Sequence, residues 1–390
     1  MTLTAHSQRL RCQKQAFSLP PDAHYLNCAY MSPLSKAVEA AGVKGVTRKS
    51  NPARISPADF FSEAEEVRRL FGEVVNAPPE HIALIPAVSY GVASVAGNLE
   101  PRAGQSVVVL HEQFPSHVYT WRALAAQGVT LKTVRPPTLA NRAQTWNAEV
   151  LSAIDADTAV VALPHVHWAD GTLFDLAAIG KRAREVGAAL VIDATQSVGA
   201  LPFDVAELQP DALFVGGYKT VMGPYGLGYA YYGERFLRGK PLEENWINRQ
   251  GSEDFSSLVA YRDAYAPGAR RFDVGERSNP ILLPMMIAAL GDILARGVTN
   301  VQHYCRELTR DVVTQASALG YALEHPDWRA HHLFGLRLAE GVTLEAVSAQ
   351  LEKRSVAVSV RGDAVRISPN VYNDEADMAA LLSALEAALP

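Results

Sequence analysis

The chain has 390 residues, of which 48% are hydrophobic and 20% are charged, and 36 Lys and Arg residues against 41 Asp and Glu residues give a net charge of −5. This composition is typical of a globular protein that buries a sizeable core, so it excludes a disordered chain, and the slightly acidic balance excludes a general nucleic-acid binder. The three cysteines, Cys12, Cys28 and Cys305, are too few and too scattered for a disulfide framework or a cysteine-rich zinc site.

The N-terminal stretch, residues 1–17, carries basic residues but lacks the apolar region of a secretory signal. It predicts a short, partly helical arm. The longest apolar stretch, residues 281–290, is interrupted by Pro284 and is far shorter than the roughly 20 residues of a membrane span. We therefore expect a cytoplasmic protein with no membrane association.

Short apolar segments recur from residue 82 onward, and each is bounded by turn residues. They are residues 82–85, 106–110, 131–134, 159–163, 189–193, 212–215 and 228–232. Strands that are buried on both faces of a sheet have this pattern.

Helical patterns lie between these segments. Ser56 and Pro57 predict an N-cap with Pro at the first helical position, and apolar residues then recur at helical spacing from Phe60 to Val74. Further helices are predicted over residues 90–98, 172–185 and 284–295. This alternation predicts an α/β fold with a mainly parallel, seven-stranded sheet and helices on both of its faces.

The pattern changes after Gly297. Helices are predicted at about 300–319, 343–354 and 374–389, with short strands near 333–338, 357–360 and 364–367. These elements predict a smaller α+β unit. We expect residues 25–292 to form a large domain, and residues 1–24 and 293–390 to form a small one.

His165 and His167 are two residues apart and point to one side of any strand that contains both. Some metal sites use such a pair, but no third ligand is evident, so we expect no metal. A metal-dependent hydrolase built on this pair is the alternative. Stock motifs such as a nucleophile elbow or a Walker loop are absent from the sequence.

Asp193 and Lys219 each follow a predicted strand. Ligands of open α/β sheets bind beyond the carboxyl ends of the strands, so both side chains are expected at one edge of the sheet. A lysine forms a Schiff base with an aldehyde, and a carboxylate keeps a pyridine nitrogen protonated. The pair therefore predicts a site for pyridoxal 5′-phosphate (PLP). The alternative is that Asp193 caps a helix and Lys219 lies on the surface.

The segments Asp193-Ala-Thr-Gln-Ser-Val-Gly-Ala and Gly-Gly-Tyr-Lys219 resemble those of the aminotransferase class V family of PLP-dependent, fold-type I enzymes. The resemblance runs from about Tyr25 to the C-terminus. It implies that Lys219 forms the Schiff base and that Asp193 pairs with the pyridine nitrogen. It also implies that Gln196 donates to the cofactor's phenolic oxygen and that Tyr218 reaches its phosphate.

Other segments match the same family. Val88 and Ser89 resemble its phosphate-binding turn, where a helix N-terminus favours an anion, although Ser89 also fits an ordinary N-cap. Phe114, in Phe-Pro-Ser, resembles the kynureninase phenylalanine that stacks on the cofactor ring; a core phenylalanine is the alternative. The resemblance places His167 and Trp168 beside the ring and brings Ser278 from the neighbouring subunit.

The resemblance also suggests how a substrate is bound. Arg366, in Arg-x-Ser, matches the arginine that binds an amino acid's α-carboxylate, for which a guanidinium offers a bidentate fork. Arg361 is a second candidate. Asn27 and Tyr30 match the loop that lines the substrate pocket, and Asn279 lies in the segment from the neighbouring subunit. A homodimer with shared active sites is thereby implied.

Residues 357–365 contain no cysteine, whereas the desulfurases of this family need a thiol just before the carboxylate-binding arginine. A persulfide-forming desulfurase is therefore not favoured. We expect a PLP-dependent aminotransferase or C–S/β-lyase that acts on a small-molecule amino acid. An amino-acid epimerase, a kynureninase-like hydrolase and a non-catalytic PLP-binding protein are the alternatives.

Overall fold

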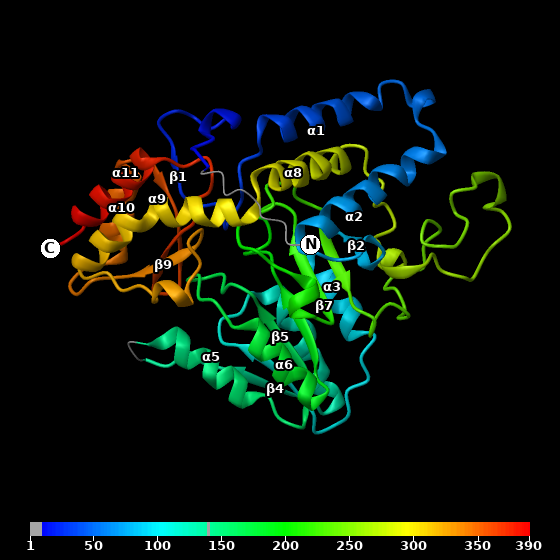
Figure 1. The fold of residues 1–390 in the computed structure, drawn as a ribbon, viewed down its shortest axis with the longest axis horizontal. Coiled ribbons are helices and arrows are strands. Elements are labelled where there is room, and N and C mark those ends of the chain that lie inside the picture. The colour runs from blue at the N-terminus through cyan, green and yellow to red at the C-terminus, as the bar shows by residue number, and fades with distance from the viewer. Residues whose placement is uncertain (1–9, 139–140) are drawn as a thin grey trace, which may run out of the picture.

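The computed structural model describes residues 10–138 and 141–390. Its centre is a seven-stranded sheet in the order β2-β8-β7-β6-β5-β3-β4 (Figure 1). These strands are β2 (Ile82–Ile85), β3 (Ser106–Leu110), β4 (Thr130–Val134), β5 (Thr158–Pro164), β6 (Ala189–Asp193), β7 (Ala212–Gly216) and β8 (Gly228–Tyr232). Only β8 pairs antiparallel with both neighbours, so the predicted mainly parallel sheet is confirmed.

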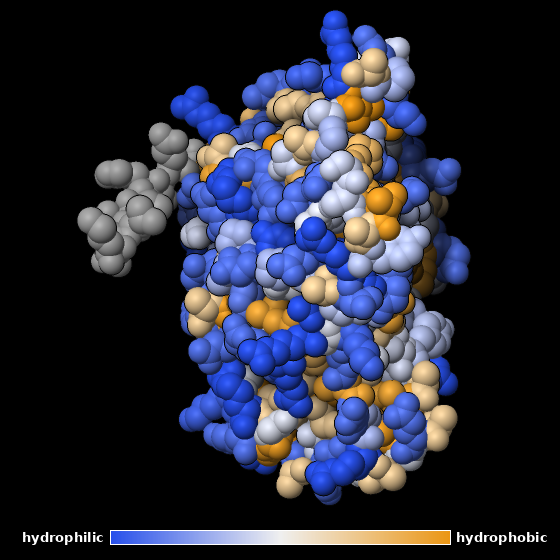
Figure 2. Space-filling view, turned by 90° about the vertical axis from the view of Figure 1, so that its right-hand side faces the viewer, coloured by the Kyte–Doolittle hydropathy of each residue, from blue (hydrophilic) through white to orange (hydrophobic). Residues whose placement is uncertain are grey.

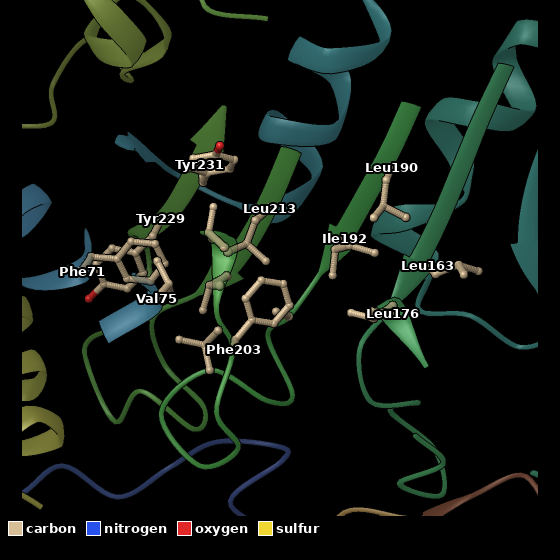
Figure 3. Close-up of a cluster of buried hydrophobic side chains, with 14 of the residues drawn as sticks. Phe71, Val75, Leu163, Leu176, Leu190, Ile192, Phe203, Leu213, Tyr229 and Tyr231 are labelled. Carbon is tan, nitrogen blue, oxygen red and sulfur yellow. The ribbon is translucent and has the colours of Figure 1, made fainter. Parts of the chain in front are cut away.

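Helices cover both faces of this sheet. They are α1 (Lys36–Arg48), α2 (Ser62–Val75), α3 (Val88–Ala96), α4 (Tyr119–Ala123), α5 (Arg142–Ala153), α6 (Leu176–Val186), α7 (Val205–Leu208) and α8 (Leu282–Arg296). Successive side chains of a strand point to opposite faces, and Leu190 and Ile192 accordingly pack in one core cluster with α2, α6 and α8 (Figure 3). Ala189 and Val191 pack in the other, with α3 and α4.

The rest of the chain forms smaller sheets. β9 (Phe334–Arg337), β11 (Ser359–Arg361) and β12 (Ala364–Ile367) form an antiparallel sheet, and β1 (His24–Tyr25) pairs in parallel with β10 (Val356–Ala357). The helices are α9 (Val298–Ala318), α10 (Leu344–Lys353) and α11 (Glu375–Glu386), which bury a core of their own with these strands. The domain boundaries proposed from the sequence stay a prediction.

Some elements begin elsewhere than predicted. Ser56 caps only a 3-10 turn, Pro57–Phe60, in a capping box with Asp59, and α2 begins at Ser62. The helix predicted from residue 172 begins at Leu176, because the side chain of Asp175 caps it. The single strand predicted over 357–360 is divided between β10 and β11, which belong to different sheets. α1, α4, α5 and α7 were not predicted.

The predicted N-terminal arm lies partly outside the described residues; within them, Lys14–Ala16 form a 3-10 helix. In the described part of the chain no single helix has the length and apolarity to cross a membrane. α8 and α9 meet those criteria only as a pair, and the pair is bent by 70°.

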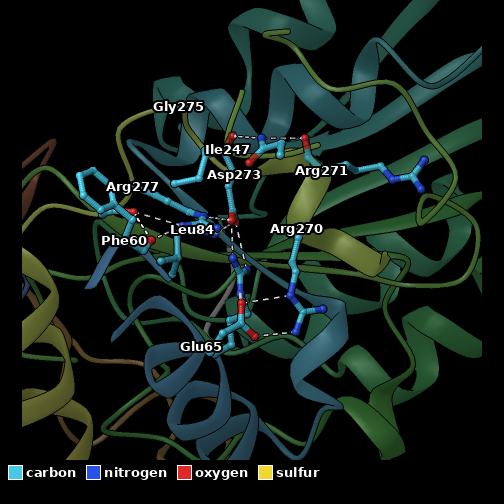
Figure 4. A network of polar contacts seen from close by, with 12 residues as sticks. Phe60, Glu65, Leu84, Ile247, Arg270, Arg271, Asp273, Gly275 and Arg277 are labelled. Carbon is cyan, nitrogen blue, oxygen red and sulfur yellow. Dashed lines mark hydrogen bonds and ion pairs between the residues drawn. The ribbon is translucent and has the colours of Figure 1, made fainter. Parts of the chain in front are cut away.

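A buried ion network ties the segment before α8 to α2 (Figure 4). Asp273 is fully buried and its carboxylate contacts the guanidinium groups of Arg68 and Arg277, which are also buried. It accepts the backbone N–H of Leu84 at 2.8 Å, and Arg68 reaches Glu65 at 3.0 Å. Buried charges are tolerated only when they are paired and hydrogen-bonded, so this network fixes the segment that leads into α8.

Candidate active site

A cavity of ≈ 160 Å³ lies at the carboxyl ends of the central strands, where ligands of open α/β sheets bind. Asp193 from β6 and Lys219 after β7 both reach it, as the sequence predicts. Phe114 and Trp168 supply aromatic walls, and Val88 lies at its edge.

Lys219 is buried, with 6% of its surface exposed, so the alternative of a surface lysine is wrong. Its Nζ lies 5.1 Å from the ring centre of Phe114 and 5.5 Å from that of Tyr218. Burial lowers the pKa of Lys219 to about 8, against the opposing effect of the Asp193 carboxylate. The neutral, nucleophilic fraction of this amine near neutral pH is therefore larger than that of an ordinary lysine.

Asp193 is held by the turn that follows β6. Its Oδ1 accepts the backbone N–H of Thr195 at 2.9 Å, so it closes a turn, and no helix begins here for it to cap. The hydroxyl of Thr195 in turn accepts the N–H of Gly216 at 3.0 Å. Thr195 thus links the ends of β6 and β7, and this fixes Asp193 relative to Lys219.

Glycine lets the chain turn tightly before Lys219. A Cβ on Gly217 would lie 2.8 Å from the carbonyl oxygen of Leu227, so no larger residue fits without moving the backbone. Tyr218 follows and lines the cavity, with its ring 4.6 Å from that of Tyr225.

Gln196 also lines the cavity. Its Nε2 donates to the carbonyl of Ala29 at 3.2 Å, and its Oε1 is buried without a partner. The amide nitrogen has a second hydrogen, which is free for the predicted donation to a cofactor oxygen. The backbone carbonyl of Gln196 accepts from Nε2 of His332 at 2.6 Å, which anchors the main chain.

The turn before α3 differs from the prediction in detail. α3 begins at Val88 with Ala87 as its N-cap, so Ser89 is a residue of the first turn rather than the cap. Ala87 and Val88 line the cavity, whereas Ser89 does not. The N–H groups of a first helical turn have no partner within the helix, and they favour an anion such as a phosphate.

His167 does not line the cavity, in contrast to the prediction. Its Nδ1 lies 3.3 Å from Oδ1 of Asp170, and its Nε2 lies 3.3 Å from the carbonyl oxygen of His111. Trp168 occupies the wall instead, because its Nε1 donates to the carbonyl of Glu112 at 2.6 Å. Of the two residues that the resemblance places beside the ring, Trp168 lines the cavity and His167 does not.

His165 packs against Phe203, with ring centres 5.4 Å apart, and thus has other surroundings than His167. No group of three or more potential metal ligands occurs within residues 10–138 and 141–390. Within these residues, the alternative of a metal-dependent hydrolase built on His165 and His167 therefore lacks a set of metal ligands.

Ser278 and Asn279 lie outside this cavity in the single chain. The hydroxyl of Ser278 donates to the carbonyl of Phe60. Oδ1 of Asn279 accepts the N–H groups of Ile281 and Leu282, each at 3.0 Å, and so fixes the start of α8. Their predicted contribution to a neighbouring subunit's site stays a prediction.

The predicted carboxylate ligands lie behind Trp168. Arg366, on β12, donates from Nη1 to the carbonyl of Trp168 at 2.8 Å, and its Nε and Nη2 are buried without partners. Arg361 lies at the end of β11 and donates to the carbonyl of Val360. Neither arginine lines the cavity directly.

The two predicted residues of the N-terminal loop differ in exposure. Asn27 is buried, accepts from the hydroxyl of Ser359 at 2.8 Å and donates to the carbonyl of Val358 at 3.3 Å, so it ties the loop to β11. Tyr30 is exposed and does not line the cavity.

His117 was not predicted, although it follows Phe114 by one turn. It is fully buried and lines the cavity, and its Nδ1 lies 3.1 Å from Nε2 of Gln113. This amide nitrogen shares its two hydrogens among Nδ1 and two carbonyls and cannot accept, so Nδ1 does not donate to it and the neutral tautomer with its hydrogen on Nε2 fits the contact. Nε2 has no partner, and burial lowers the pKa of His117 to about 4. A neutral donor thus faces the cavity, and the sequence signal was its position in the Pro115–His117 turn.

A family model described as aminotransferase class-V matches residues 56–381. The "uncharacterized aminotransferase YcbU" of Bacillus subtilis is 26% identical over 323 residues, 82% of each chain. A probable cysteine desulfurase of Pyrococcus abyssi is 31% identical over 246 residues, which are 61% of this chain and 56% of that protein.

Solved structures share the fold. The cystine C–S lyase C-DES, in complex with cysteine persulfide, superposes with a TM-score of 0.84 at 19% identity over 95% of this chain and 99% of that one. A cysteine desulfurase of Thermococcus onnurineus has a TM-score of 0.80 at 21% identity, over 97% and 98% of the two chains. The fold-type I architecture predicted from the sequence is thereby confirmed.

Proposed function

The chain belongs to the aminotransferase class-V family of PLP-dependent enzymes, and we propose that the cavity around Lys219 is its active site for transamination or β-elimination on a small-molecule amino acid. One observation carries this assignment: Lys219, with its lowered pKa, and Asp193 enter the same cavity at the ends of adjacent strands. The alternative of a non-catalytic binding protein has no support from the enzymes that the chain resembles.

The donor set of the cavity fits PLP. Lys219 is the amine for its aldehyde, Asp193 is the carboxylate for its pyridine nitrogen, and the first turn of α3 is a place for its phosphate. Buried polar atoms without partners, Oε1 of Gln196 and Nε2 of His117, are further groups that a polar ligand would satisfy. PLP, when bound, withdraws electrons from the bonds of a substrate's α-carbon.

The side chains of the site have separate tasks in the reaction. Lys219 moves the proton at the substrate's α-carbon, a role for which a pKa near 8 is suited. Asp193 keeps its orientation through the N–H of Thr195. Arg366 has two free guanidinium nitrogens for the α-carboxylate, while the carbonyl of Trp168 holds the third.

The cysteines do not favour a thiol-dependent desulfurase. Burial raises the pKa of Cys28 to about 11 and raises the pKa of Cys305. Both therefore stay protonated near neutral pH and are poor nucleophiles. Among the lyase reactions, we propose β-elimination without a sulfur-accepting thiol of the chain.

A homodimer with shared active sites and a cytoplasmic location are part of the proposal. The long loop of residues 241–266 supports the dimer. It extends from the rest of the chain at the right of Figure 1 and exposes the apolar side chains of Val259 and Tyr261, which a second subunit would cover. Figure 2 looks onto this side, where apolar residues appear in several separate spots among hydrophilic ones.

Single-turnover mass spectrometry of the PLP-loaded protein with a panel of amino acids tests the reaction type. A keto acid with an aminated cofactor means transamination, and pyruvate with unchanged PLP means β-elimination. Inversion of the α-carbon would support the epimerase alternative, and anthranilate from kynurenine would support the hydrolase. A protein that neither takes up PLP nor turns over any amino acid would overturn the proposal.

A further inference from the structure

Two guanidinium groups lie against one indole at the wall of the cavity. Cζ of Arg361 is 5.5 Å and Cζ of Arg366 is 5.9 Å from the ring centre of Trp168. The antiparallel pair β11 and β12 carries both arginines, one on each strand. Cations are favoured near an aromatic face, so the indole fixes where both charges lie.

The positive charge of this pair is not compensated. Nη1 of Arg366 donates to a carbonyl and its Nε and Nη2 have no partner, while Nη1 of Arg361 donates only to the neighbouring carbonyl of Val360. In the described part of the chain, neither arginine forms an ion pair with a carboxylate within 4.0 Å. Arg366 is buried and Arg361 is partly exposed. Their like charges repel one another beside the same indole, and an anion between them removes this repulsion.

The carboxylates of Glu112 and Asp363 contact other side chains than the two arginines. Oε1 of Glu112 lies 3.9 Å from Nδ1 of His111. Oδ2 of Asp363, in the turn between β11 and β12, lies 3.8 Å from Nε of Arg337. The positive field reaches the reacting amine as well, since Arg366 and Arg361 both lower the pKa of Lys219.

We propose that Arg361 forms a second anion subsite, so that the substrate is a dianionic amino acid whose α-carboxylate binds Arg366 and whose acidic side-chain group binds Arg361. This inference rests on the proposed function. The side-chain group is an oxyanion such as a carboxylate or a sulfinate, since a guanidinium binds either through paired N–H donors. A monoanionic amino acid would leave one of the two guanidinium groups unpaired.

The test compares acidic substrates with neutral analogues. The kcat/KM of the PLP-loaded enzyme is measured for aspartate against asparagine and for cysteine sulfinate against cysteine, in the wild type and in Arg361→Gln. We expect the wild type to prefer the acidic member of each pair, and Arg361→Gln to reduce that preference by about 10–100-fold, as for a hydrogen bond to a charged group. Arg306→Gln, at an exposed arginine on α9, is the matched control and should leave the ratio unchanged.

Binding provides a readout without turnover. In calorimetry with the PLP-loaded enzyme, succinate should bind more tightly than its monoamide, and Arg361→Gln should remove the difference. An equal loss for acidic and neutral substrates would mean that Arg361 serves the α-carboxylate, which overturns the second subsite. If neutral amino acids are turned over and Arg361→Gln leaves the ratio of acidic to neutral kcat/KM unchanged, only the subsite is overturned. If no amino acid is turned over, the proposed function is overturned with it.

Discussion

The Nζ atom of Lys219 lies 5.1 Å from the centre of the Phe114 ring, inside a cavity that closes around both side chains. The ring is part of the surroundings that bury the amine, and this burial is the main reason why the pKa of Lys219 falls to about 8. Phe114 therefore has two functions in the cavity wall. Its flat face is suited to pack against a planar ring, and its contact with Lys219 helps to keep the amine reactive.

Lys219→Ala should abolish catalysis, because no other lysine of residues 10–138 and 141–390 lines the cavity. The expected loss in kcat is at least the roughly 10²–10⁴-fold attributed to a positioned acid–base group. Borohydride reduction of the wild type should fix PLP to the peptide that contains Lys219, as seen by mass spectrometry. Lys132→Ala, at a lysine that pairs with Asp155, is the control and should retain both properties. PLP found on another lysine would contradict the assignment.

The rate of PLP uptake should rise with pH and level off above about pH 8, because only the neutral Lys219 amine attacks an aldehyde. The folded pKa lies below the ordinary 10.5, so between pH 8 and 10.5 the unfolded chain binds the proton that the folded chain has lost. The free energy of unfolding of the PLP-free protein should therefore gain a contribution from Lys219 as the pH rises through this window. Absorbance changes on PLP uptake give the first profile, and urea titrations give the second. If the rate of PLP uptake were still rising near pH 10, the pKa of Lys219 would not be lowered.

Most of the central sheet could be predicted because its strands are buried on both faces. β2, β3, β6 and β8 have the bounds that the apolar runs indicate. α1 was missed because its small residues blur the pattern. Gly42 lies against Met285 of α8, and a Cβ on Gly45 would collide with the backbone of Pro280, just before α8. Such close packing follows from tertiary contact and leaves no periodic apolar signal.

The site was predictable where the backbone itself points a residue at the sheet edge, as for Asp193 and Lys219. It was not predictable where the choice between neighbours depends on side-chain contacts. Asp170 draws His167 away from the cavity and Trp168 takes its place. His117 was missed because its position depends on a 3-10 turn that periodicity does not reveal.

Asp273→Ala should destabilise the protein strongly, because it leaves the buried guanidinium groups of Arg68 and Arg277 without their counter-ion. Breaking a buried ion pair by removing one partner costs about 3–5 kcal/mol. Denaturant unfolding measures the loss. Glu66→Ala, which removes an exposed partner of Arg69, should cost at most about 1 kcal/mol. Equal losses for the two variants would show that the buried network contributes no more than a surface pair.

His117→Leu should weaken PLP binding and, at the same time, preserve or raise the stability of the PLP-free protein. The reason is that Nε2 of His117 is a buried donor without a partner until a ligand arrives, and such a group costs about 1–3 kcal/mol. An apolar side chain of similar size removes this cost, but it also removes the donor from the cavity. We expect the Kd for PLP to rise by about tenfold or more, as for one hydrogen bond to a charged group.

His165→Leu is the matched control for this prediction. Nδ1 of His165 is likewise buried without a partner, and burial lowers the pKa of His165 to about 4, yet the side chain does not line the cavity. It should therefore show the stability effect without the loss of PLP affinity. Fluorescence titration with PLP and thermal unfolding of the PLP-free proteins separate the two quantities. If His117→Leu lowered stability and left the Kd unchanged, His117 would be a structural residue of the cavity wall, because its free donor would then face no part of the ligand.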